Sequence, residues 1–138
     1  MKKNKIYFVI GIIVIAILSR LIPHPPNFTP ITALALFSII NFKNKYIGLA
    51  IPLICLIISD FILGISLINL FVYLSFILIS GIGLIFGKIN FKSILISSLI
   101  FFVVSNFGVW IIGYPKTLEG FINCYIAAIP FFGWTIAG

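Results

Sequence analysis

The sequence predicts an all-α polytopic membrane protein, a bundle of about six transmembrane helices, and two observations indicate this fold. Hydrophobic residues make up 62% of the 138 positions and charged residues only 8%, which leaves too little polar surface for a soluble domain of this size. Apolar runs close to the ~20 residues that cross a bilayer recur almost end to end. Residues 1–138 are therefore predicted to form a single transmembrane domain.

Polar and proline-containing segments separate the predicted helices. These helices span residues 5–22, 30–42, 46–64, 67–87, 93–113 and 118–136. The first follows Met-Lys-Lys-Asn-Lys and imitates a secretory signal, but no small-x-small cleavage site follows it. We therefore interpret it as the first membrane helix.

The second helix is predicted to be short. At ~1.5 Å per residue, residues 31–42 reach only about 18 Å, less than the ~30 Å of hydrocarbon in a bilayer. We expect neighbouring helices or a partly buried loop to help this segment across. Pro30 suits its first turn, because the proline ring fixes a helical φ.

Short patterns predict local structure in two later helices. Gly83 and Gly87 form a small-xxx-small pair, which is typical of close helix packing in membranes. Thr117 is the expected N-cap of the last helix, and Glu119 lies in its first turn, where a negative charge is favourable.

The basic residues predict an orientation with both termini cytoplasmic. Six crossings place seven lysines inside and only Arg20 and Lys116 outside, as the positive-inside rule requires. The seven are Lys2, Lys3, Lys5, Lys43, Lys45, Lys88 and Lys92. Because the net charge of +7 is scattered between apolar segments rather than gathered in a patch, we expect the lipid bilayer, and no nucleic acid, as a partner.

Polar residues gather toward the predicted outer face. They are Arg20, His24, Asn27, Asp60, Asn69, Tyr73, Ser105, Asn106, Trp110, Tyr114, Lys116, Glu119, Asn123 and Tyr125. Asn106 and Trp110 are four residues apart, as are Glu119 and Asn123, so each pair shares one helical face. Unpaired polar groups in an apolar medium are costly, so the cluster predicts mutual pairing, a water-filled recess or a bound ligand.

Several of these residues have a structural interpretation as well. Asp60 pairs with Arg20 or contacts a ligand, with about even weight. His24 is more often an interfacial residue than a metal ligand. An aromatic belt accounts for Trp110 and Tyr125 as well as a ligand does.

The amides of Asn106 and Asn123 favour a ligand, because an amide inside a membrane helix needs a partner. The segment His24, Pro25, Pro26, Asn27, Phe28, Thr29 and Pro30 is rigid, since its prolines fix their own φ and restrict their neighbours. This segment is either a lid over the recess or an economical connection to a short helix.

No motif indicates catalysis, a cofactor or a metal. The sequence contains no His-Glu-x-x-His, no Gly-x-Ser-x-Gly and no phosphate-binding glycine loop. We therefore assign no catalytic or metal-ligating residue and no cofactor, and we expect the protein not to be an enzyme. Any energy coupling must then come from partners.

Four strings resemble one known family. They are RLIPHPPNFTPITALALF (20–37), ISDFILG (58–64), SNFGVW (105–110) and YPKTLEGFINCYIAAIPFF (114–132). They resemble a family of small bacterial membrane proteins of unknown function, usually described as candidate transport proteins. That family is similar to the substrate-binding S components of energy-coupling-factor (ECF) transporters.

The resemblance implies a subunit in the bacterial inner membrane that captures a vitamin or similar micronutrient from outside. An energy-coupling transmembrane protein and ATPases would help it to hand this substrate inward. By the same resemblance, ligand contact falls to Asn27, Asp60, Asn106, Trp110, Glu119, Asn123 and Tyr125, and gating to residues 24–30. Relatives are expected to continue past Gly138, so that the chain is either truncated there or its last helix ends abruptly.

The sequence also allows two alternatives to a transport subunit. A non-transporting membrane scaffold needs no recess, and its function would not depend on Asn106 or Asn123. An intramembrane enzyme ranks lowest, because no second intramembrane histidine is present to act as a base.

Overall fold

A computed structural model describes residues 3–23 and 31–137, which fold into helices without a strand in these two stretches. The helices are α1 (Lys3–Leu21), α2 (Ile31–Asn41), α3 (Lys45–Leu63), α4 (Ile68–Phe86), α5 (Phe91–Gly113) and α6 (Leu118–Ala137). Each end lies within two residues of the one predicted. The all-helical fold class is therefore confirmed.

Five of the six helices have the length and apolar composition needed to cross a membrane. Large apolar side chains also cover the outside of the molecule. Ile15, Phe61 and Ile85, for example, are 68%, 73% and 78% exposed. In water such a surface would aggregate, whereas in a bilayer it contacts lipid. The chain is a multi-pass membrane protein.

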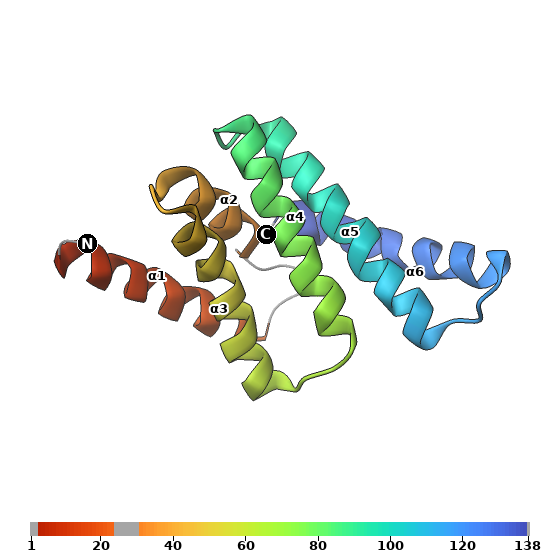
Figure 1. The fold of residues 1–138 in the computed structure, drawn as a ribbon. Coiled ribbons are helices and arrows are strands. Elements are labelled where there is room, and N and C mark those ends of the chain that lie inside the picture. Colours follow the sequence, from red (N-terminus) through yellow and green to blue (C-terminus); the bar gives the residue numbers. More distant parts are fainter. Residues whose placement is uncertain (1–2, 24–30, 138) are drawn as a thin grey trace.

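The sixth helix, α2, has only 11 residues and is shorter than the other five, but it forms the centre of the fold. It packs against α3, α4 and α5, and Ile31, Ala35 and Leu36 are fully buried. The remaining helices spread outward from this centre, with α1 against α3 and α6 against α5 (Figure 1). As a result α1 and α6 lie at opposite edges of the bundle.

Small residues bring the central helices close together. The Ser38 hydroxyl of α2 donates a hydrogen bond to the Gly48 carbonyl of α3 at 2.7 Å, and a Cβ at Gly48 would meet the Ser38 carbonyl oxygen at 2.8 Å. Gly83 of α4 leaves room for the Ile39 side chain. Gly87 is predicted to share this packing role, but a Cβ added there would meet no atom within 4 Å, and Gly87 instead ends α4 with a φ of 63°.

The buried residues of α5 are small, whereas α4 also buries the large apolar side chains of Phe76 and Ile79. Five buried residues of α5 are Ser93, Ser97, Ser98, Ser105 and Gly108. Because lipid tails are as apolar as leucine, membrane helices associate through close contact of small residues, and these serines permit it.

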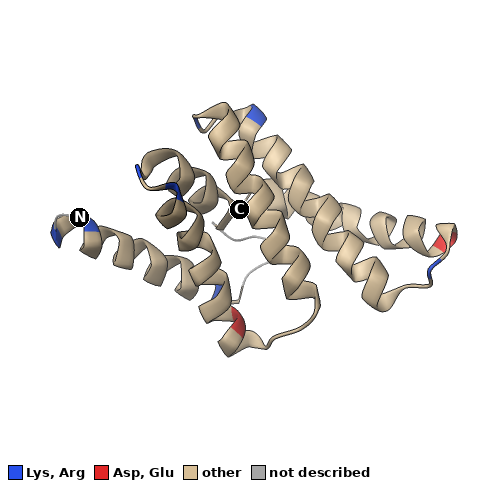
Figure 2. Ribbon diagram, in the orientation of Figure 1, with Lys and Arg blue, Asp and Glu red and all other residues tan. Residues whose placement is uncertain are grey.

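The two ends of the bundle differ in charge (Figure 2). Lys5 of α1 lies beside the α2–α3 turn, and the end of α4 packs on Ile39 near the end of α2. One end therefore carries the lysines at positions 3, 5, 43, 45, 88 and 92, which we call the lysine-rich end. Arg20 and Lys116 lie at the opposite end.

Candidate functional site

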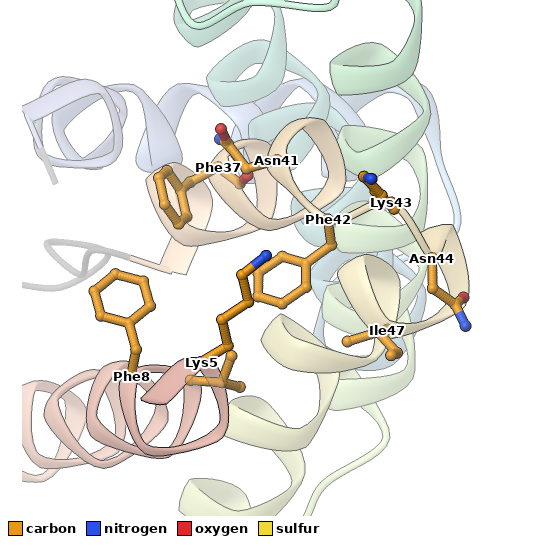
Figure 3. Close-up of a pocket in the computed structure, with 9 residues that line it drawn as sticks. Lys5, Phe8, Phe37, Asn41, Phe42, Lys43, Asn44 and Ile47 are labelled. Atoms are coloured by element: carbon orange, nitrogen blue, oxygen red, sulfur yellow. The ribbon is translucent and has the colours of Figure 1, made fainter. Parts of the chain in front are cut away.

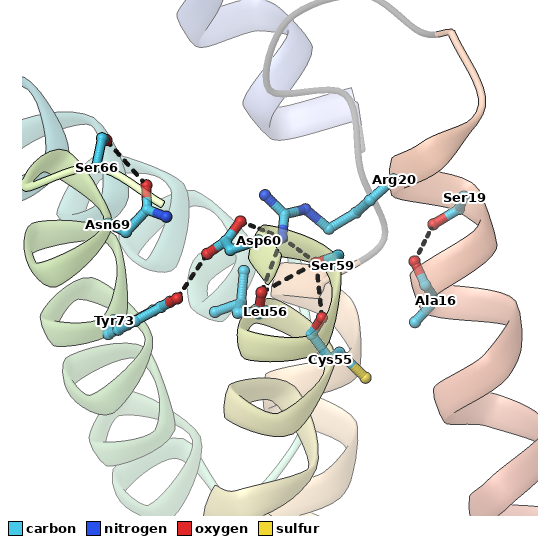
Figure 4. A network of polar contacts seen from close by, with 10 residues as sticks. All are labelled: Ala16, Ser19, Arg20, Cys55, Leu56, Ser59, Asp60, Ser66, Asn69 and Tyr73. Carbon is cyan, nitrogen blue, oxygen red and sulfur yellow. Dashed lines mark hydrogen bonds and ion pairs between the residues drawn. The ribbon is translucent and has the colours of Figure 1, made fainter. Parts of the chain in front are cut away.

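A buried carboxylate is the centre of the candidate site. Asp60, in the last turn of α3, is 5% exposed. One of its oxygens accepts a hydrogen bond from Arg20 Nη1 of α1 at 3.0 Å, and the other accepts one from the Tyr73 hydroxyl of α4 at 2.7 Å (Figure 4). Three helices thus meet at one carboxylate, and we call this set of contacts the Asp60 network.

Arg20 adds further contacts through the same nitrogen. Its Nη1 also donates to the Ser59 hydroxyl and to the Leu56 carbonyl, the latter at 3.4 Å. Within the described part of the chain, Nε and Nη2 make no hydrogen bond. A guanidinium presents its donors in a planar fork, which is the geometry that pairs with an acceptor such as a carboxylate.

Local sequence brings these groups together. Lys5 lies beside the start of α3 and Arg20 beside its end, so α1 and α3 run parallel. Gly64, with a φ of 115°, then ends α3 and lets the chain turn back into α4. Tyr73 consequently faces Asp60 from the neighbouring helix.

Asn69 leaves one buried donor unused next to this network. It lies one helical turn before Tyr73 and on the same face of α4 (Figure 4). Its Oδ1 accepts a hydrogen bond from Ser66 at 3.3 Å, whereas its Nδ2, which lies near the Tyr73 hydroxyl, is buried without a hydrogen bond of good geometry among the described residues. An unpaired buried amide is unfavourable, so this donor is a candidate to bind a ligand.

A second group of predicted residues lies between α5 and α6. The Asn106 amide donates to the Phe102 carbonyl of its own helix at 2.8 Å. Trp110 Nε1 donates to the Pro115 carbonyl at 3.0 Å, and the Tyr125 hydroxyl donates to the Val103 carbonyl at 2.6 Å.

Aromatic contacts join the same two helices. The ring centroids of Trp110 and Phe121 are 5.3 Å apart, and those of Phe121 and Tyr125 are 4.7 Å apart. Trp110 and Tyr125 thus act in helix packing in this structure, and their role toward a substrate stays a prediction.

Three predicted residues lie outside both groups. Glu119 and Asn123 are exposed on α6, and Asn27 falls with the whole predicted gating segment, 24–30, outside the described residues. The expected N-cap of α6 is present, because Thr117 Oγ1 accepts a hydrogen bond from the Gly120 amide at 3.1 Å.

The structure therefore divides the predicted polar cluster into two separate groups. Asp60 belongs to the network of α1, α3 and α4, and no hydrogen bond between described residues joins it to Asn106, Trp110 or Tyr125. The same described stretches contain no group of three or more histidine, cysteine, aspartate or glutamate residues that would hold a metal.

The sequence placed Arg20, Asn69 and Tyr73 in the outer polar cluster but assigned none of them to binding, and it gave Ser59 no role. The spacing of two of these residues could have indicated that they belong to the site. Asn69 and Tyr73 are four residues apart at the same predicted depth as Asp60, a spacing equal to that of the Asn106–Trp110 pair.

Comparison with known proteins gives one family. Its sequence model matches residues 1–138, and its description is a family of unknown function, DUF6580. No curated protein and no solved structure matches the chain.

Proposed function

Because the chain belongs to the DUF6580 family of unknown function, we propose a role from its own residues. It is the substrate-binding subunit of a membrane transporter and captures a vitamin or similar micronutrient from the outer face. We propose the bacterial inner membrane as its location, with both termini in the cytoplasm. In capturing a substrate from the outer face, it acts like the S components of ECF transporters.

One observation carries the proposal: the buried Asp60 network lies beside the unpartnered Asn69 amide. Ionisable groups within membrane helices are expensive to bury and usually mark substrate or ion pathways. A purely structural ion pair would explain Arg20 and Asp60, but it would not explain why a buried amide donor beside them has no partner.

The donors and acceptors of the site indicate a substrate class. Arg20 Nη2 and Asn69 Nδ2 suit an acceptor on the substrate, such as a carboxylate or a ring carbonyl. Arg20 and Asp60 neutralise each other, so the site favours a solute that presents acceptors without a large net charge of its own. A small heterocyclic compound with carbonyl or carboxylate groups fits this description.

Transport also requires partners. The sequence has no phosphate-binding loop, so ATP hydrolysis would come from separate ATPases, linked through an energy-coupling transmembrane protein. The edge helices α1 and α6 each pack mainly on one neighbour, and their outer faces are apolar. These faces suit contact with a transmembrane partner.

The same apolar edges favour the alternative, a non-transporting scaffold that organises other membrane proteins. In a scaffold, the Asp60 network would only hold α1, α3 and α4 together. Substitutions that leave the network intact but alter Asn69 would then have no functional effect.

The experiment is purification in mild detergent followed by mass spectrometry of small molecules that copurify. The test variant is Asn69→Leu, which removes the free donor and leaves Arg20, Asp60 and Tyr73 in place. Ser98→Ala is the matched control, because it removes from α5 another buried polar group that has no hydrogen bond among the described residues.

We expect a small molecule to copurify with the wild-type protein and with Ser98→Ala, but not with Asn69→Leu. Adding that molecule at about 100 times its Kd should stabilise the wild type by ~2.7 kcal/mol against thermal unfolding. Equal recovery from all three proteins would refute the assignment of the site. An empty wild-type protein that also pulls down no ATPase would favour the scaffold.

A further inference from the structure

A cavity of about 380 Å³ lies at the lysine-rich end, far along the helices from the Asp60 network. Its walls come from the start of α1, the end of α2 and the turn that leads into α3. They include Lys5, Phe8, Phe37, Phe42 and Lys43 (Figure 3). This volume falls within the ~300–1,000 Å³ of typical small-molecule sites.

The two lysines of this cavity carry unneutralised charge. Lys5 extends from α1 toward the α2–α3 turn (Figure 3), and within the described stretches neither its ammonium nor that of Lys43 makes a hydrogen bond or ion pair. Lys45, which does not line the cavity, instead donates to the Ile39 carbonyl at 2.7 Å. The chain has only two acidic residues, Asp60 and Glu119, and neither lines the cavity.

A second cavity, of about 360 Å³, adjoins the first at Phe37. It is lined by Ile12 and Ile15 of α1, by Leu34 of α2 and by Ile89 from the turn between α4 and α5. Its walls are almost entirely apolar. Phe37 lines both cavities, which we together call the groove: it is basic and aromatic around Lys5 and Lys43 and apolar around Ile12, Ile15 and Leu34.

We infer that this groove binds an anionic phospholipid. The phosphate would lie between Lys5 and Lys43, and an acyl chain would follow α1 past Phe37 toward Ile15. Basic pockets between transmembrane helices on the cytoplasmic side bind acidic headgroups in this way. The charge complementarity and the order of the two cavities both match a molecule with one anionic end and one apolar end.

The site is tested by native mass spectrometry of the purified protein with phosphatidylglycerol, with phosphatidylcholine and with inorganic phosphate. The test variant is Lys5→Gln/Lys43→Gln. The matched control is Lys88→Gln/Lys92→Gln, which removes the same charge from the same end of the bundle but outside the basic cavity. Melting temperatures verify that both variants are folded.

We expect the wild type and the control to prefer phosphatidylglycerol over phosphatidylcholine by about 30-fold. Each lysine near an anionic lipid should raise the affinity about fivefold, and the two factors multiply. Lys5→Gln/Lys43→Gln should lose most of that preference. An equal loss in both variants would mean that general surface charge attracts the lipid, which would overturn the site. Binding of inorganic phosphate as tight as that of the lipid would also overturn it, since the apolar half of the groove would then contribute nothing.

Discussion

Arg20 of α1 and Asp60 of α3, 40 residues apart in the sequence, form an ion pair of 3.0 Å in the interior of the bundle. The Arg20 side chain is 18% exposed and that of Asp60 only 7%, so the carboxylate is the more buried partner. In a buried pair, removing one partner is worse than removing both, because the survivor keeps its charge without compensation. The ion pair therefore holds α1 against α3 in addition to the apolar packing between these helices.

Arg20→Leu should destabilise the protein by ~3–5 kcal/mol, since it leaves Asp60 buried and unpaired. The double variant Arg20→Leu/Asp60→Leu should recover much of that loss. Thermal unfolding in detergent, followed by circular dichroism, measures both. If the double variant is less stable than Arg20→Leu, the charge of Asp60 is not what destabilises the single variant.

Tyr73→Phe should cost ~1.5–3 kcal/mol, the value of a hydrogen bond to a charged group. Tyr125→Phe is the matched control, because its hydroxyl bonds only to the neutral Val103 carbonyl. A neutral hydrogen bond is worth ~0.5–1.5 kcal/mol. Chemical unfolding curves of the two variants should therefore differ, and equal losses would argue against a charged Asp60 as the acceptor from Tyr73.

Gly48→Ala should destabilise the contact between α2 and α3 by ~1–3 kcal/mol, the usual penalty for overpacking. The new Cβ would lie 2.8 Å from the Ser38 carbonyl oxygen and 2.9 Å from the Ile39 Cα, and neither backbone atom can move without shifting α2. Gly81→Ala is the control, because a Cβ there meets nothing within 4 Å. Alanine favours a helix over glycine by up to ~1 kcal/mol, so Gly81→Ala should be neutral or stabilising in the same assay.

The positive-inside rule predicts which end of the bundle faces the cytoplasm, and labelling of single cysteines tests it. A cysteine at position 116 should react with a membrane-impermeant thiol reagent in intact cells. One at position 88 should react only after the membrane is permeabilised. The native Cys55 and Cys124 are buried, so background labelling should be low. The reverse pattern would invert the orientation and put the Asp60 network on the cytoplasmic side.

The positions of the helices follow from local properties of the chain. Apolar runs form the helices and polar segments separate them, which is why every predicted end lies within two residues of the observed one, although Pro52 and Pro130 lie inside α3 and α6. The N-cap at Thr117 is equally local, since it joins residues only three apart.

The partners of individual side chains were harder to predict. The sequence favours a ligand for the Asn106 amide, and this role stays a prediction; the structure adds a hydrogen bond from that amide to the Phe102 carbonyl four residues earlier. Gly87 matched a packing pattern, but its positive φ shows that it ends α4 instead. In both cases the same residue spacing is compatible with two local arrangements, and only the contacts with neighbouring residues decide between them.

By itself, then, the sequence determined the membrane setting, the six helices and the gathering of most lysines at one end of the bundle, because hydrophobicity and charge act at the scale of one helix. Tertiary structure alone decided that Asp60 meets Arg20 and Tyr73 while Trp110 and Tyr125 pack between α5 and α6. The physical reason is that contacts between helices depend on which faces can approach, and small residues such as Gly48 and Ser98 set that approach through their neighbours in space.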